Sequence, residues 1–89
     1  MQNESNKTAV TVDQPTAPEL TFGQKRVGVT FNPSGKPEVN AFKSSTAQAI
    51  DELKRFSDAS TDPEAKRAFA EAMTQYENAC MWAVKAFTK

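Results

Sequence analysis

The chain has 89 residues, with 11 basic and 11 acidic side chains, no histidine and one cysteine. This length supports one small domain, and a single cysteine excludes an intrachain disulfide. Without histidine, Cys/His zinc sites and Ser-His or Cys-His nucleophile pairs are excluded as well. Because so short a chain buries little apolar surface, we expect self-association to supply the missing stability.

Residues 1–21 predict a flexible N-terminal arm, because they are rich in Gln, Asn, Ser and Thr and contain too few apolar side chains to offset the entropy of ordering. Within the arm, Ala9-Val10-Thr11-Val12 has β propensity and fits either an edge strand or a segment lying over a neighbouring subunit, but the run is too short to decide between them. No stretch approaches the ~18 apolar residues of a membrane span, and the N-terminus lacks the order of a signal peptide. We therefore expect no membrane partner and a cytosolic location.

Residues 22–37 predict a short extended segment followed by a tight turn. Val27, Val29 and Phe31 alternate with polar or small residues, as in a strand. The turn is predicted at Asn32-Pro33-Ser34-Gly35, where proline presets one torsion angle and glycine supplies a positive one.

The same stretch carries three cations and no acid, although the whole chain is neutral. These cations, Lys25, Arg26 and Lys36, are either solvated loop charges or contacts for a small anionic ligand. The sequence Pro33-Ser34-Gly35-Lys36 lacks the glycine spacing and the following Ser/Thr of a Walker loop, which excludes that type of nucleotide hydrolase. Zero net charge also argues against duplex DNA or RNA as a partner.

Two amphipathic helices are predicted next, from Glu38 to about Asp58 and from Pro63 to about Thr88. Between them Thr61 or Asp62 is expected to cap the second helix, whose first turn holds Pro63. The short connection makes the helices antiparallel neighbours, so the predicted fold class is all-α, an antiparallel two-helix hairpin. The apolar positions that define the two faces are Val39, Phe42, Ala49, Ile50, Leu53 and Phe56, and Phe69, Met73, Tyr76, Cys80, Ala83 or Val84, and Phe87.

Two polar clusters on these helices leave two interpretations each. Lys43-Ser44-Ser45-Thr46 either faces an anionic oxygen or marks a close helix crossing. Lys66 and Arg67 open the second helix, where the backbone dipole favours an external anion, yet pairs of Asp62 with Lys66 and of Arg67 with Glu71 explain much of the pattern.

Three residues near the C-terminus are expected to pack against other apolar side chains and not to react or to bind a ligand. Cys80 falls in the apolar stripe, where a reduced thiol acts as a small hydrophobe. Met81 and Trp82 project away from the stripe and favour contact between subunits over stacking on a base. No convincing pair of acid and base is present, so we expect neither catalysis nor a cofactor or metal.

Three separated segments carry a family resemblance: residues 26–35 (RVGVTFNPSG), Ile50-Asp51, and residues 79–86 (ACMWAVKA). Together they resemble the small phage anti-CBASS cyclic-nucleotide sponges, which are related to the helical-hairpin domain of the anti-Thoeris sponges. The similarity spans residues 22–89, which therefore form the hairpin domain after the arm. It implies a homo-oligomer, expected to be a hexamer, that binds cyclic di- and trinucleotides such as cGAMP and cyclic tri-adenylate in the host cytoplasm without hydrolysing them, and so blocks CBASS immunity.

The resemblance also implies site residues. Lys43 matches a family lysine that contacts phosphate, Ser45 supplies a hydroxyl, and Arg67 matches an arginine that some members use for cyclic trinucleotides. Some members stack a base on a tyrosine of an N-terminal Tyr-Arg element, for which Arg26 or Phe31 is the substitute in this chain.

Two other functions fit the residues. A helical adaptor or inhibitor would offer Met81 and Trp82 to a host protein, and a virion assembly accessory would form a helical oligomer that needs no ligand. Substitution of Lys43 separates the sponge from the adaptor, because it removes a phosphate contact and leaves an apolar docking face intact.

Overall fold

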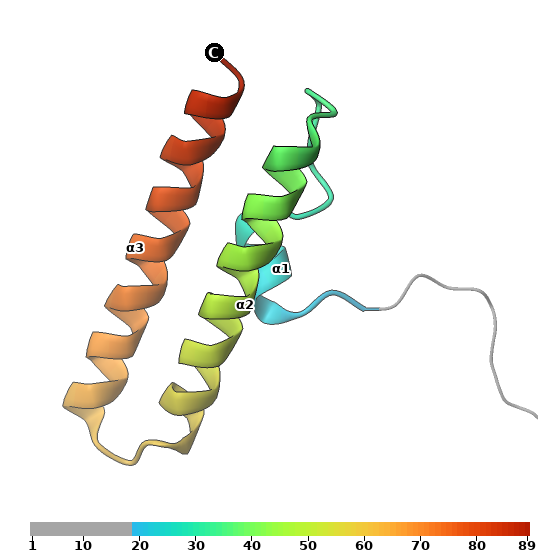
Figure 1. Ribbon diagram of the computed structural model, residues 1–89. Coiled ribbons are helices and arrows are strands. Elements are labelled where there is room, and N and C mark those ends of the chain that lie inside the picture. Colours follow the sequence, from blue (N-terminus) through green and yellow to red (C-terminus); the bar gives the residue numbers. More distant parts are fainter. Residues whose placement is uncertain (1–18) are drawn as a thin grey trace, which may run out of the picture.

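The computed structural model describes residues 19–89, which form three helices. They are α1 (Phe22–Val27), α2 (Pro37–Ala59) and α3 (Pro63–Phe87). The long helices α2 and α3 run antiparallel and side by side, which confirms the predicted all-α hairpin (Figure 1). The arm predicted for residues 1–21 and the strand alternative at residues 9–12 lie outside the described residues, apart from the last three residues of the arm.

Helix α1 corrects the prediction of an extended segment. Thr21 and Gln24 form a capping box, in which the Thr21 hydroxyl accepts from the Gln24 N–H at 3.1 Å and the Gln24 side chain accepts from the Thr21 N–H at 2.9 Å. Gly28 ends the helix with a φ of 66°, and the N–H of Val29 donates to the carbonyl of Gln24 at 3.0 Å. The hydrogen bonds of these two caps stabilise a helix, although the alternation of Val27, Val29 and Phe31 had indicated a strand.

The predicted turn before α2 is confirmed. Gly35 has a φ of 68°, and its N–H donates to the carbonyl of Asn32 at 3.1 Å. Lys36 is the N-cap residue of α2, and its N–H donates to the Ser34 hydroxyl at 3.2 Å. Pro37 occupies the first position of the helix, where its missing N–H removes no hydrogen bond.

The connection between α2 and α3 also follows the sequence. Of the two alternatives for the cap, Asp62 is the N-cap residue, and its carboxylate accepts from the Glu64 N–H at 3.1 Å. The sequence predicted a pair of Asp62 with Lys66, but the Lys66 ammonium instead donates to the Ser57 carbonyl at 2.8 Å. This hydrogen bond links α3 to α2.

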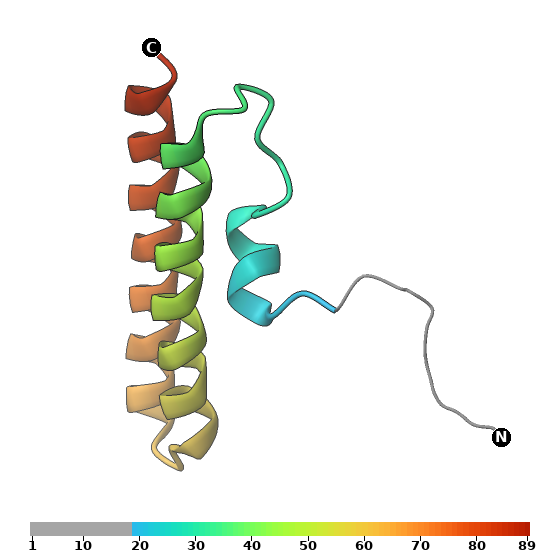
Figure 2. The same cartoon turned by 45° about the vertical axis from the view of Figure 1, so that its right-hand side comes forward.

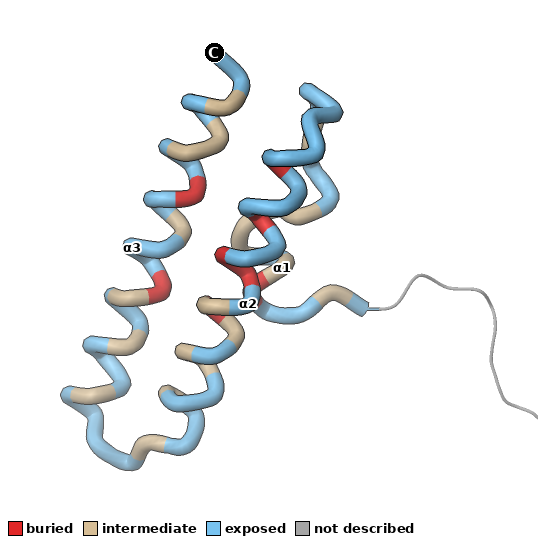
Figure 3. The backbone as a smooth tube through the Cα atoms, in the orientation of Figure 1, coloured by how far each residue is buried: buried red, intermediate tan, exposed pale blue. Residues whose placement is uncertain are grey.

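A thin core lies between the helices (Figure 3). Its buried apolar side chains are Val39, Ala47, Ile50, Met73 and Cys80. Larger apolar side chains border this core and stay partly open: Phe42 meets Phe87 edge-on, and Phe56 stacks on Phe69. A core this thin leaves much apolar surface uncovered on the single chain.

Helix α1 lies against α2, well separated from the turn that joins α2 to α3 (Figure 2). Gly23 allows the close approach, since a Cβ at this position would fall 2.2 Å from the Ala47 carbonyl oxygen. The Asp51 carboxylate accepts from the Gly23 N–H at 2.6 Å and satisfies an amide at the start of α1. These two contacts place the segment after α1 beside the middle of the hairpin.

Candidate ligand-binding site

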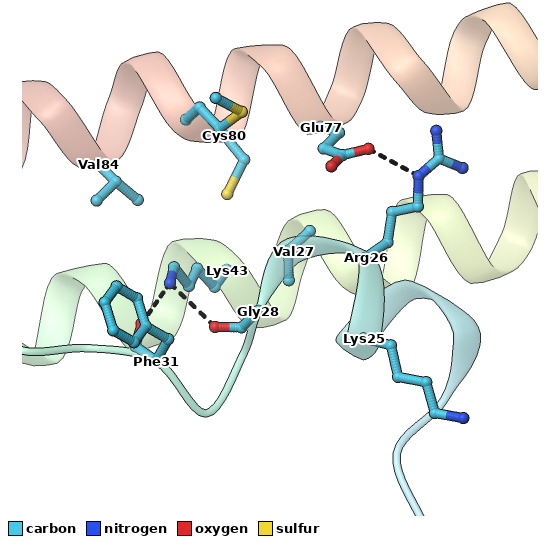
Figure 4. A pocket seen from close by; sticks show the side chains of 10 residues that line it. Lys25, Arg26, Val27, Gly28, Phe31, Lys43, Glu77, Cys80 and Val84 are labelled. Atoms are coloured by element: carbon cyan, nitrogen blue, oxygen red, sulfur yellow. Dashed lines mark hydrogen bonds and ion pairs between the residues drawn. The ribbon is translucent and has the colours of Figure 1, made fainter.

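A pocket of about 380 Å³ opens between α1, its following turn and the facing sides of α2 and α3 (Figure 4). This volume falls within the roughly 300–1,000 Å³ of small-molecule sites. Three of the lining side chains are cationic and one is acidic. The lining residues are Lys25, Arg26, Val27, Gly28, Phe31, Lys43, Glu77, Cys80, Met81 and Val84.

Lys43 reaches the pocket from within the hairpin and is only 7% exposed. Its ammonium donates to the Gly28 carbonyl at 3.0 Å and to the Phe31 carbonyl, so it fastens the turn after α1 to α2 (Figure 4). Within residues 19–89 it forms no ion pair with an acid. A buried ammonium with neutral acceptors alone is costly, because burial removes the water that stabilised its charge.

Arg26 borders the pocket on the side of α1. Its Nε lies 2.7 Å from Oε1 of Glu77, and its terminal nitrogen donates to the Thr74 hydroxyl at 3.1 Å. Both charged side chains are about one-third exposed. The pair therefore links α1 to α3 and offsets the Arg26 charge. Lys25 lies 3.7 Å from a carboxylate oxygen of Glu19, so among the three cations of this pocket Lys43 is the one that pairs with no acid of residues 19–89.

Phe31 lines the pocket at the turn after α1. Its side chain is among the most exposed large hydrophobic groups of the described residues, at 69%. The Lys43 ammonium lies 5.6 Å from the centre of its ring and is bonded to its backbone carbonyl. Lys43 thus fixes the backbone that presents an open aromatic face.

The sequence was compared with family models, curated proteins and solved structures. The family model described as "Acb2/Tad1, hairpin domain" matches residues 24–88. The chain belongs to this family. Neither the curated proteins nor the solved structures gave a match.

Membership in the Acb2/Tad1 hairpin family confirms the resemblance inferred from the three sequence segments. All ten lining residues of the pocket fall between positions 25 and 84, inside the matched stretch. The pocket is therefore built entirely by the family domain.

Three of the five predicted site residues meet at the pocket of this family domain. Arg26, Phe31 and Lys43 come together there from α1, the turn and α2. Two others lie elsewhere. Ser45 is exposed on α2 and does not line the pocket.

Arg67 lies at the other end of the hairpin. It is 13 residues before Cys80 on α3, which corresponds to roughly 20 Å along the helix. Its side chain is 76% exposed and pairs with Glu64 at 2.6 Å, where the sequence predicted a pair with Glu71. On one chain, Arg67 and Lys43 cannot contact the same small ligand.

The hydroxyl-bearing residues of α2 fit different interpretations: one is buried, as at a close helix crossing, and two are exposed, as a contact with an external anion requires. The Thr46 hydroxyl is buried and donates to the Phe42 carbonyl at 2.9 Å, as expected for a close helix crossing. Ser44 and Ser45 are exposed and remain open to an external partner.

Sequence reasoning named the segment from Arg26 to Phe31, which includes Gly28, and missed Glu77 and Cys80 as parts of the pocket. One signal was present: residues equally distant from the α2–α3 connection oppose each other in an antiparallel hairpin, which places Lys43 opposite Ala79, the residue before Cys80. Nothing in the sequence indicated that Glu77 meets α1, because that contact depends on where α1 docks.

Two further properties concern the part of the chain that the structure describes. No three His, Cys, Asp or Glu side chains gather there in a way that would hold a metal ion. None of its helices combines the length and apolarity of a membrane-crossing segment.

Proposed function

We propose that this protein is a phage anti-defence sponge that binds cyclic di- and trinucleotide messengers, such as cGAMP and cyclic tri-adenylate, and so blocks CBASS immunity. It would act in the cytoplasm of the infected bacterium. Its mechanism is mass action, because a bound messenger cannot reach its effector. Support comes from membership in the Acb2/Tad1 hairpin family and from the charge of the pocket.

The observation that carries the proposal is the buried ammonium of Lys43. An ammonium has three donor hydrogens, and two of them are used by the carbonyls of Gly28 and Phe31. The third is available to a phosphate oxygen, with which it would form a charge-assisted bond. A phosphodiester would supply the counter-charge that residues 19–89 do not provide.

Binding without hydrolysis fits the lining of the pocket. Its acid, Glu77, accepts from Arg26 and is thereby held in a structural ion pair. The chain contains no histidine that could serve as general base. A group that must activate water has to be free to take a proton, and this carboxylate is poorly suited to that task.

A homo-oligomer, with a hexamer as the expected form, accounts for the exposed apolar side chains. Tyr76, Met81 and Trp82 of α3 are 46%, 63% and 69% exposed on the single chain. Surfaces of this kind usually pack against another subunit. Assembly would also give Ser45 and Arg67 a role, since seams between subunits can join them to ligands that one chain alone cannot reach.

The test is thermal unfolding of the purified full-length protein with a panel of cyclic di- and trinucleotides. A ligand present at about 100 times its Kd stabilises the folded state by about 2.7 kcal/mol, which raises the melting temperature by several degrees. We expect at least one member of the panel to do so and to be recovered intact by chromatography. No shift at saturating concentration, or recovery of a cleaved product, contradicts the proposal.

The second candidate is a helical adaptor or inhibitor of a host protein, favoured by the exposure of Met81 and Trp82. Lys43→Met separates the two functions. It removes the buried charge that we assign to phosphate and leaves the outer face of α3 unchanged. An adaptor would keep its partner, whereas a sponge would lose its ligand.

A further inference from the structure

Phe22, the first residue of α1, is a large apolar side chain that stays 41% exposed. Two cations approach its ring from two different helices. The guanidinium carbon of Arg26 lies 5.6 Å from the ring centre, and the Lys54 ammonium of α2 lies 5.4 Å from it. Both distances fall inside the roughly 6 Å range of cation–π attraction. This attraction gives a reason for an aromatic ring at a partly exposed position.

The ring stands on a backbone that is held in place. The Asp51 carboxylate of α2 accepts from the N–H of Gly23, the residue after Phe22, at 2.6 Å. Residues four apart on a helix lie on the same face, so Arg26 is the neighbour of Phe22 one turn further along α1. The position of Phe22 relative to α2 therefore sets where the Arg26 side chain starts.

Arg26 needs a support because its long side chain reaches from α1 to α3. Its Nε donates to Glu77 at 2.7 Å, and one terminal nitrogen donates to Thr74 at 3.1 Å (Figure 4). A guanidinium carries five donor hydrogens, and these contacts use two of them. An aromatic ring attracts the cation without taking up a donor hydrogen. Phe22 can therefore orient the guanidinium while, within residues 19–89, three of its donors stay without a partner.

Building on the proposed function, we propose that Phe22 is a positioning residue, whose ring orients Arg26 so that the remaining guanidinium donors meet a phosphate of the bound nucleotide. Arg26 lines the pocket and Phe22 does not, so Phe22 acts through Arg26. A planar guanidinium binds phosphate through two parallel hydrogen bonds, which require a fixed orientation. A guanidinium that turns freely must lose that freedom on binding, which weakens the affinity.

The test is a double-mutant cycle, measured by isothermal titration of the full-length protein with cGAMP and with cyclic tri-adenylate. The four proteins are wild type, Phe22→Leu, Arg26→Met and the double variant. We expect Phe22→Leu to weaken binding about two- to fivefold, the range of one partly exposed cation–π contact. In the Arg26→Met background the same change should have no further effect. A side chain that merely stabilises the fold would weaken binding in both backgrounds alike.

Two further proteins separate the electrostatics of the ring from its shape. A phenylalanine that carries three ring fluorines keeps the shape of Phe22 and loses the negative charge of its face, so it should weaken binding as Phe22→Leu does. Phe22→Tyr keeps the negative face and should bind like wild type. Phe56→Leu is the matched control, because Phe56 is 57% exposed and no cation of residues 19–89 lies over its ring.

A second measurement needs no ligand. The Nε–H group of Arg26 gives its own NMR signal, whose order parameter reports how firmly the guanidinium is held. We expect Phe22→Leu to lower this order parameter, and Phe56→Leu to leave it unchanged.

The outcomes distinguish this inference from the proposed function. If wild type binds either nucleotide and Phe22→Leu binds it equally well, the positioning role is refuted and the sponge function stands. An equal loss of affinity in the wild-type and Arg26→Met backgrounds also refutes it, as does an unchanged Arg26 order parameter in Phe22→Leu. If wild type binds neither nucleotide, both proposals fail.

Discussion

Gly23 of α1 lies so close to α2 that a Cβ at its position would fall 2.2 Å from the carbonyl oxygen of Ala47. Contacts this short do not occur, so a side chain here must push α1 away from α2. The site depends on this approach, because α1 and its turn form one wall of the pocket.

Gly23→Ala should therefore destabilise the protein by about 1–3 kcal/mol, the usual cost of overpacking, and weaken ligand binding as well. Denaturant unfolding and titration measure the two effects. Gly35→Ala is the comparison: nothing lies within 4 Å of its Cβ position, and its φ of 68° should cost only about 1–2 kcal/mol of backbone strain. Equal ligand binding by Gly23→Ala and wild type would show that the pocket does not need α1 in this position.

Asp51 should hold the start of α1. Its carboxylate accepts from the Gly23 N–H at 2.6 Å, and such charged hydrogen bonds contribute about 1.5–3 kcal/mol. We expect Asp51→Ala to speed hydrogen exchange of the amides of residues 22–28 while exchange in α3 stays slow. Glu52→Ala, one residue along and exposed, is the control. Unchanged protection of α1 would contradict the role given to Asp51.

Arg26 and Glu77 should couple α1 to α3. Their side chains are about one-third exposed, so the pair is expected to contribute up to about 1 kcal/mol, and less at high salt. A double-mutant cycle of Arg26→Ala and Glu77→Ala, followed by urea unfolding, measures the coupling. Zero coupling at low salt would show that the ion pair does not stabilise the docked α1.

The long helices α2 and α3 were easier to predict from the sequence than the short helix α1. The long helices were predicted closely because their apolar periodicity and their caps point to the same structure: the second was expected from Pro63 and begins there. Helix α1 was missed because it has only six residues, and the alternation of Val27, Val29 and Phe31 suggested a strand. The capping box of Thr21 and Gln24 was the signal that would have corrected it.

The site was less predictable for a physical reason. A lysine is normally exposed, and the local sign of burial is that Lys43 stands four residues after Val39 and seven before Ile50, on the apolar face of α2. Its burial depends on the carbonyls of Gly28 and Phe31, which reach it only after α1 has docked on α2. Pockets built by tertiary contacts of this kind leave little trace in periodicity or spacing.

Trp82→Glu should dissolve the proposed oligomer. Trp82 is 69% exposed on the single chain, and a carboxylate buried at a subunit seam would be strongly unfavourable. Size-exclusion chromatography with light scattering should show an assembly for wild type and for the exposed control Lys89→Glu, and smaller species for Trp82→Glu. A monomeric wild type would contradict the assembly itself.

The central claim is that Lys43 provides a buried positive charge for a cyclic nucleotide. Isothermal titration of wild type, Lys43→Met and Lys66→Met with cyclic dinucleotides tests it most directly, because Lys66 also donates to a backbone carbonyl but lies at the far end of the hairpin. We predict saturable binding by wild type and Lys66→Met, and a loss of at least about tenfold for Lys43→Met, since charge-assisted bonds contribute about 1.5–3 kcal/mol. Equal affinity of the three proteins, with Lys43→Met still folded, would contradict the account.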